Sequence, residues 1–297
     1  MLKTIDKGVL YMLLAALISA LNGAVTKILT QDLSALEVVF FRNLLGVVII
    51  VYALKHTPPK LTKGKLHLLI TRGIFGFIAM ILFFYTITTI PLGEAITLNK
   101  TSPLFGTILA FYFLKERLNK TTLLALLIGF VGIIMITKPM GMSVSYDHAM
   151  GILGGFFAAA AYTTIKKIKD IYDARIIVLS FVTVGTIIPI ILFLVAPYVK
   201  VDDSIVFLFE EFRMPSSYLV WLLIGFMALI STLSQWLLTK AYSASKISII
   251  GVISYTNIPF AIGFGWMLGD MIPGFLTFCG IALIVIGGVL VARRSRQ

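Results

Sequence analysis

Ten stretches of mostly apolar residues, each close to twenty residues long, follow one another along the chain. A helix of about 20 apolar residues crosses the hydrocarbon core of a bilayer, so the pattern predicts ten spans. Backbone groups without partners in lipid cost several kcal/mol, which makes every span helical. The spans cover residues 8–28, 35–54, 66–88, 92–114, 121–138, 149–167, 175–196, 217–240, 246–268 and 273–292.

The composition agrees with this pattern. Of the 297 residues, 59% are hydrophobic and 13% are charged, whereas soluble proteins carry about 25% charged residues. A soluble chain of this length has too little interior to bury so much apolar surface. We therefore expect an all-α, multi-pass membrane protein, and not a soluble enzyme, a nucleic-acid-binding protein or a disordered chain.

The net charge of +12 is mainly a signal of topology. With both termini cytoplasmic, eighteen Lys and Arg residues fall in the cytoplasmic segments and four in the outer ones. Cytoplasmic loops collect basic residues, so this asymmetry predicts ten spans with both ends inside. We expect the chain in the plasma (inner) membrane of a prokaryote.

The chain also contains a diverged internal repeat. The segment from Asn99 to Pro103 parallels the segment from Tyr255 to Pro259, and a glycine-bearing span follows each. We expect a first five-helix repeat over 1–140 and a second over 148–297. Five is an odd number, so the second copy is inverted in the membrane, as is typical of transporters with a site near the midplane.

Several short motifs carry a resemblance to a known family. They are Phe41-Arg42-Asn43, Thr71-Arg72-Gly73, the stretch from Ser102-Pro103-Leu104 to Leu118, and the stretch from Asn257-Ile258-Pro259 to Asp270. With these motifs the chain resembles the drug/metabolite transporter superfamily, specifically its EamA-type members. The resemblance implies two inverted five-helix repeats around a central cavity, working by alternating access. Asp270 is a departure, since the family usually has Glu there.

Three basic residues lie inside predicted spans, where a charge costs about 2.5–3.5 kcal/mol or more. They are Arg42, Arg72 and Lys100, while Glu37 and Glu94 lie near the outer mouth. The excess of positive charge favours a substrate that carries a negative group. Two alternatives stay open: Arg72 extends to the cytoplasmic face, and Arg42 binds backbone carbonyls as a structural strut.

Other polar and aromatic residues complete the candidate site. The full set of expected substrate-binding residues is Asn22, Arg42, Arg72, Tyr85, Glu94, Asn99, Lys100, Tyr162, Gln235, Trp236, Tyr255 and Asn257. Pro103 and Pro259 are expected to kink or gate their helices, and Glu94 is the candidate for proton coupling. The alternatives are that the amides join helices, the aromatic residues face lipid and the prolines serve packing alone.

The leading hypothesis is a secondary active transporter of a small organic metabolite, anionic or zwitterionic, such as an amino-acid-like or nucleoside-like compound. A flippase for a lipid-linked or amphipathic substrate is the alternative, and a membrane enzyme acting on a phosphate-bearing lipid is a more distant one. The sequence contains no Walker, H-E-x-x-H or G-x-S-x-G motif. We expect no enzyme activity, no cofactor, no metal and no nucleic acid. The expected partners are the lipid bilayer, a small-molecule substrate and a proton or exchanged solute, for a monomer or homodimer.

Overall fold

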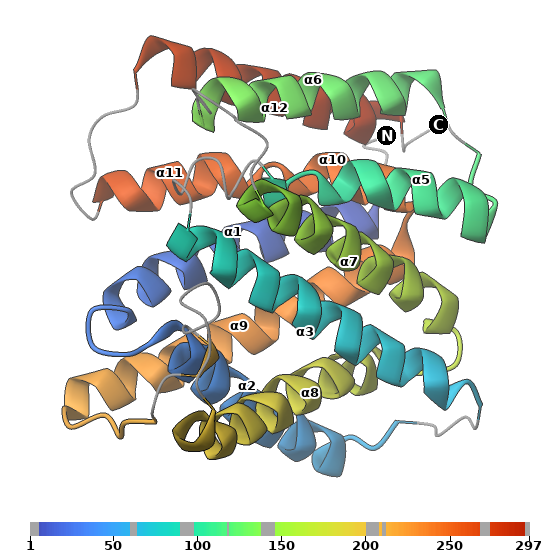
Figure 1. Cartoon of the computed structure of the whole chain (residues 1–297). Helices are drawn as coiled ribbons and strands as arrows, with labels where there is room; N and C mark the ends of the chain where they lie inside the picture. The colour runs from blue at the N-terminus through green and yellow to red at the C-terminus, as the bar shows by residue number, and fades with distance from the viewer. Residues whose placement is uncertain are drawn as a thin grey trace.

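A computed structural model describes residues 6–59, 64–89, 98–117, 119–137, 146–199, 208–209, 212–267 and 274–294, and these contain helices but no strand (Figure 1). The first half of the chain forms α1 (Lys7–Leu29), α2 (Ala35–His56), α3 (Leu66–Thr89), α5 (Ser102–Leu114) and α6 (Lys120–Thr137). The second half forms α7 (Tyr146–Ile168), α8 (Ala174–Val195), the short η1 (Ala196–Tyr198), α9 (Tyr218–Ala244), α10 (Ile247–Ser254), α11 (Asn257–Met267) and α12 (Phe275–Arg294).

These helices confirm the all-α fold with ten spans. Seven segments of the described chain are long and apolar enough to cross a membrane, and one of them joins α10 to α11. The remaining three spans correspond to the shorter apolar helices α5, α6 and α12. Helix α5 begins ten residues after the predicted start at 92, and the residues from 90 to 97 lie outside the described ranges.

Side chains at the helix ends explain where two of the helices begin. Ser34 and Glu37 form a capping box at the start of α2, in which each side chain accepts a hydrogen bond from the other residue's backbone N–H. The Glu37 carboxylate also accepts a hydrogen bond from the backbone N–H of Arg213, and only 3% of the residue is exposed. Glu37 is thus a buried cap rather than a residue at the mouth of a pore. Asp6 caps α1 in a similar way, through the N–H of Gly8.

The main contacts between helices come in matched pairs: when each helix is replaced by its counterpart in the other half, the same contact is found again. Helix α1 packs on α9 as α3 packs on α7, and α3 packs on α8 as α9 packs on α2. Helix α2 meets its counterpart α8, and α6 meets its counterpart α12 along the upper edge of Figure 1. This pairing agrees with the predicted repeat, whose division at 140 and 148 stays a prediction because residues 138–145 lie outside the described ranges.

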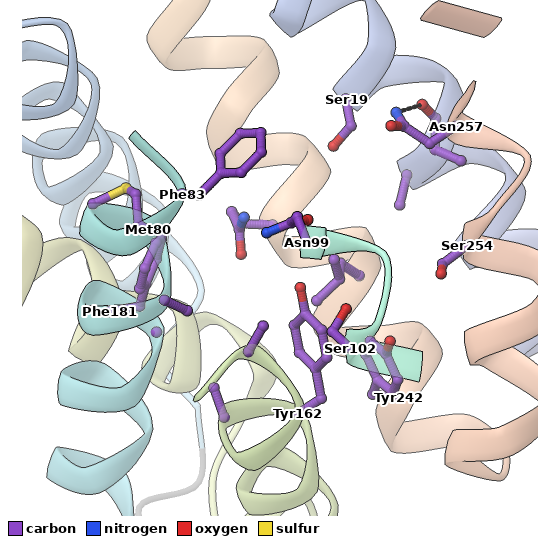
Figure 2. Close-up of a pocket in the computed structure, with 18 of the residues that line it drawn as sticks. Ser19, Met80, Phe83, Asn99, Ser102, Tyr162, Phe181, Tyr242, Ser254 and Asn257 are labelled. Atoms are coloured by element: carbon purple, nitrogen blue, oxygen red, sulfur yellow. Dashed lines mark hydrogen bonds between the residues drawn. The ribbon is translucent and has the colours of Figure 1, made fainter. Parts of the chain in front are cut away.

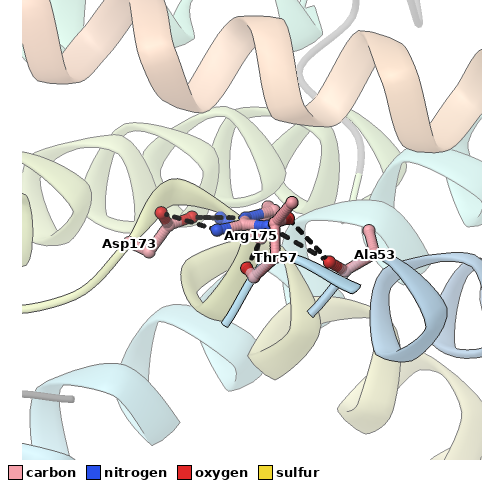
Figure 3. A network of polar contacts seen from close by, with 4 residues as sticks. All are labelled: Ala53, Thr57, Asp173 and Arg175. Atoms are coloured by element: carbon pink, nitrogen blue, oxygen red, sulfur yellow. Dashed lines mark hydrogen bonds and ion pairs between the residues drawn. The ribbon is translucent and has the colours of Figure 1, made fainter. Parts of the chain in front are cut away.

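The links α2–α3, α5–α6, α7–α8 and α9–α10 meet at one end of the bundle, together with the start of α1 (Figure 1). In one network there, Arg175 is paired with Asp173 and donates to the Thr57 side chain and to the Thr57 and Ala53 carbonyls (Figure 3). In another, Ser245 donates to Asp6. The positive-inside pattern assigns this end to the cytoplasm, an orientation that stays a prediction.

Gly132 lets α6 and α12 approach closely, and this contact gives the first testable prediction. A Cβ atom at Gly132 would lie 2.6 Å from the backbone oxygen of Gly280, which cannot rotate away. We expect Gly132→Ala to separate the two helices and to lower the free energy of unfolding by about 1–3 kcal/mol. The measurement is the apparent melting temperature of the protein in detergent.

The matched control is Gly225→Ala in α9, where an added Cβ meets nothing within 4 Å. Alanine favours a helix over glycine by about 0.5–1 kcal/mol, so this variant melts at the same temperature or higher. Equal melting temperatures for both variants would contradict the packing argument.

The Asp173–Arg175 pair predicts a pH dependence of stability. The hydrogen bonds from Arg175 hold the pKa of the Asp173 carboxyl below its usual range. A lowered pKa in the folded state means that the pair stabilises the fold above the unfolded pKa of about 3.9, and that this contribution is lost as the pH falls through the folded-state pKa. Asp173→Asn keeps a good helix cap but removes the charge. The difference in melting temperature between wild type and this variant should be constant from about pH 7 to 5 and should shrink below about pH 4. A difference that persists unchanged at lower pH would refute the pairing.

Candidate functional site

A cavity of about 280 Å³ lies among the helices of both halves. Side chains of α1, α2, α3, α7, α8 and α9 line it, together with residues around the start of α5 and the junction of α10 with α11. In Figure 2, Met80, Phe83 and Phe181 stand on one side, and Asn99, Ser102, Ser254 and Asn257 stand on the other. One wall therefore carries aromatic and thioether side chains, beside which Arg42 and Arg72 lie, and the other carries amide and hydroxyl groups.

Interrupted helices supply the wall with the amide and hydroxyl groups. The turn at Lys100–Thr101 precedes α5, and the turn at Tyr255–Thr256 separates α10 from α11. In both turns a threonine hydroxyl donates to a carbonyl three residues earlier, Thr101 to Leu98 at 2.6 Å and Thr256 to Ile253 at 2.7 Å. Non-helical backbone at membrane depth is tolerated where it lines a cavity.

The two prolines lie just after these turns, each in the first turn of the helix that follows. Pro103 is the second residue of α5 and Pro259 is the third residue of α11. A proline in the first turn removes only an N–H that has no partner inside the helix, so it fits this position. Pro103 also packs against α10, where a Cβ on Gly251 would come within 2.8 Å of it. Whether either proline acts as a gate stays a prediction.

Arg72 is the most deeply buried charge of the cavity, with 2% of the residue exposed. Its Nε and Nη1 atoms are buried and have no hydrogen-bond partner among the described residues. The guanidinium carbon lies 5.0 Å from the centre of the Phe181 ring, a cation–π contact. This position excludes the alternative in which Arg72 extends to the cytoplasmic face.

Arg42 approaches the same ring from α2. Its guanidinium carbon lies 6.0 Å from the centre of Phe181, and Nη2 lies 2.6 Å from the sulfur of Met80. A thioether is a weak acceptor and carries no charge, and within the described chain the buried Nε has no partner. The described residues show no bond from Arg42 to a backbone carbonyl that would support the alternative of a structural strut.

Lys100 is the third cation and lies in the turn before α5. It is half-buried, and its ammonium group makes no ion pair or hydrogen bond with the residues that the structure describes. No Asp or Glu of the described chain lines the cavity. The described lining thus contains three cations and no carboxylate.

Neutral groups complete the lining. The rings of Tyr162 and Tyr242 are stacked, with their centres 4.4 Å apart and their planes 13° from parallel, and Tyr162 points toward Asn99 in Figure 2. Ser19 shares a 2.7 Å hydrogen bond with Ser234, and Asn257 donates to the carbonyl of Ala16. These bonds join α1 to α9 and to α11 beside the cavity.

Seven of the predicted binding residues line this cavity, and four more lie elsewhere in the described chain. The seven are Arg42, Arg72, Asn99, Lys100, Tyr162, Gln235 and Asn257. Tyr85 instead donates a 2.5 Å hydrogen bond to Asp147, and Trp236 lies 5.3 Å from the Lys240 ammonium. Tyr255 is buried against Gly129, and Asn22 has a buried side-chain oxygen without a partner. Glu94 lies outside the described residues. A role of any of these residues in binding stays a prediction.

The sequence reasoning missed several lining residues, namely Ser19, Ser102, Phe181, Tyr242 and Ser254. Single serines and aromatic residues are common throughout apolar helices, so none of them stands out in the sequence. A usable signal existed for Ser102, which follows the polar run from Asn99 to Thr101. Within the described part of the chain, no group of three or more His, Cys, Asp or Glu residues is placed to hold a metal ion.

Comparison with known proteins bears on this geometry. Residues 6–138 match the EamA-like transporter family. The pseudopaline exporter CntI of Pseudomonas aeruginosa is 29% identical over 296 residues, which make up 99% of each chain. An uncharacterized transporter of Helicobacter pylori is 31% identical over 98% of this chain and 96% of its own length. A solved crystal structure matches 99% of this chain and 100% of its own, with a TM-score of 0.77 and 14% identity, which shows a common fold alone.

The charges of the cavity predict which reagents reach it. With the single cysteine removed as Cys279→Ser, Ser19→Cys places a thiol in the lining. A negatively charged methanethiosulfonate reagent should modify it faster than a positively charged one, because a positive cleft concentrates anions. Both rates are divided by those at Tyr198→Cys, a residue that is 88% exposed. We expect this normalised ratio to favour the anionic reagent at least about threefold. Ile133→Cys, in the buried core, should stay unmodified. A ratio near one would contradict a positive, water-accessible cavity.

Proposed function

The chain belongs to the EamA-like transporter family, and we propose that it is a secondary transporter for a small organic anion or zwitterion. Family membership makes it a small-molecule transporter rather than an enzyme. The observation that carries the proposal is the set of three cations, Arg42, Arg72 and Lys100, without an acidic partner in the described lining. Amino-acid-like and nucleoside-like compounds are the substrate types we favour.

The arrangement of the helices supports transport by alternating access. The cavity lies between the predicted repeats, and each repeat contributes one interrupted helix to it. In transporters built from inverted repeats, rocking of one repeat against the other moves access to the site from one side of the membrane to the other. Lys100 lies at one interruption, and Ser254 and Asn257 flank the other. On this proposal the substrate contacts lie on segments that move relative to one another.

The membrane and the coupling are part of the proposal. We place the protein in the inner membrane with both termini in the cytoplasm, as its basic residues predict. Transport is driven by a proton or by exchange against a second solute. Glu94 is the candidate proton carrier, because it is an acid within a predicted span close to Lys100 in sequence.

Loss of the Lys100 charge should impair transport. Purified protein in liposomes is tested with radiolabelled glutamate, succinate and uridine 5′-monophosphate, and with choline as a cationic control. We expect accumulation of at least one anionic compound above protein-free liposomes, and no accumulation of choline. Lys100→Gln should lower the initial rate of that uptake at least about tenfold, since removing one partner of a buried charge pair costs 2–5 kcal/mol or more.

The matched control is Lys55→Gln, which removes an exposed charge near the end of α2. It should keep the rate within about twofold of wild type, because an isolated exposed charge contributes little. Equal rates for the two variants would overturn the assignment of Lys100 to the substrate. Uptake measured with and without an inward proton gradient separates proton coupling from exchange.

A further inference from the structure

Arg42 and Arg72 form a pair on one wall of the cavity. The Arg72 guanidinium lies beside Gly76, where an added Cβ would come within van der Waals overlap of Nη1, and the Arg42 guanidinium contacts Met80. Gly76 and Met80 are four residues apart on α3, so they lie on one face, about 5–6 Å from each other. Both guanidinium groups therefore occupy adjacent turns of the same helix face.

Phe181 of α8 holds this pair in place. Its ring lies 5.0 Å from the guanidinium carbon of Arg72 and 6.0 Å from that of Arg42. One ring face attracts a cation but neutralises none of its charge. Two like charges beside the same ring repel each other, and burial removes the water that would screen them. Neither arginine forms an ion pair within the described chain.

A carboxylate or phosphate group is the partner that two such forks recognise. Arginine presents its N–H groups in a plane that matches two oxygens at once, and the free atoms here are Arg42 Nε and Arg72 Nε and Nη1. Lys100 is a separate point charge, because it comes from the turn before α5, whereas the two arginines come from α2 and α3. A single negative group on the first wall leaves the Lys100 charge without a partner, at a cost of several kcal/mol when the cavity closes.

We infer that Arg42 and Arg72 form one anion subsite, positioned by Phe181, that Lys100 receives a second negative group, and that the substrate is an organic anion with two separated negative groups. The inference rests on the proposed function in taking the cavity as the place of the transported solute. Gly76 determines the specificity of the first subsite, because only the absence of a side chain leaves room for the Arg72 guanidinium.

Binding to the purified, full-length protein in detergent tests the inference without transport. The probes are the dicarboxylates from malonate to adipate, the monocarboxylates of equal chain length, 3-phosphoglycerate and glycerol 3-phosphate. At least one dicarboxylate or 3-phosphoglycerate should bind at least about tenfold more tightly than any monocarboxylate, because each added charge-assisted pair strengthens binding. A preference for dicarboxylates assigns carboxylates to both subsites, and a preference for 3-phosphoglycerate assigns a phosphate to one. Either result supports the inference.

Three variants test the architecture of the first subsite. Phe181→Leu and Gly76→Ala should each reduce the preference for the two-charge probe over the monocarboxylate at least about threefold, and Phe181→Tyr, which keeps the ring, should restore it. Gly225→Ala and Lys55→Gln should leave the preference unchanged. A melting temperature close to that of wild type shows that each variant is folded. If Gly76→Ala does not fold, the Phe181→Tyr and Phe181→Leu pair carries the test, and if Phe181→Leu does not fold, Gly76→Ala carries it.

Three results would overturn the inference: monocarboxylates that bind as tightly as any probe, binding of glycerol 3-phosphate alone, or binding of none of the probes. The proposed transport function fails separately. Uptake of a monoanion in liposomes would support the transport function and refute the inference of two subsites. Tight dicarboxylate binding without any uptake would support the two subsites and refute the transport function.

Discussion

The central constraint on this molecule is that a membrane interior contains no water to satisfy polar groups. Every backbone N–H and C=O must find a partner inside the protein, and a helix provides one. Non-helical backbone is therefore confined to places where other groups supply these hydrogen bonds. The two interruptions beside the cavity have such groups, because Thr101 and Thr256 each return a hydroxyl to a carbonyl in the preceding turn. The cavity lies beside these two interruptions.

The same constraint acts more strongly on charge. A charged side chain in a membrane needs a partner, a cavity or a route to the surface. Arg42 and Arg72 have instead a ring and a thioether, which lower the cost of burial without removing the charge. The bundle is held together by close helix contacts elsewhere, such as α6 with α12. Stability of the fold thus comes from one set of contacts, to which these two cations contribute no ion pair within the described chain.

The sequence predicted the span pattern and the buried charges well, because both follow from local physical rules. A charge inside an apolar run is conspicuous, and the charges of Arg42, Arg72 and Lys100 all reach the cavity. The sequence could not decide which neutral residues join them. Helices that are apolar on nearly every side do not reveal which face turns inward, so Tyr85 and Trp236 were expected at the site, whereas Phe181 and Tyr242 line it. Glu37 shows a further limit, since its capping role depends on Ser34 and on Arg213, far away in sequence.

Several contacts that join the two halves toward the ends of the bundle are polar. At one end Ser245 donates to Asp6, and a Glu116 oxygen accepts from the backbone N–H of Ile247. Elsewhere Tyr85 of α3 donates to Asp147 of α7. Individual hydrogen bonds contribute only about 1 kcal/mol net, since water replaces them when they open. Alternating access, as proposed here, requires that each end open at small cost while the cavity stays intact. At the ends, water can replace the hydrogen bonds when they open. At the centre, water or lipid would have to replace the contacts of the buried cations, so the cavity opens less readily.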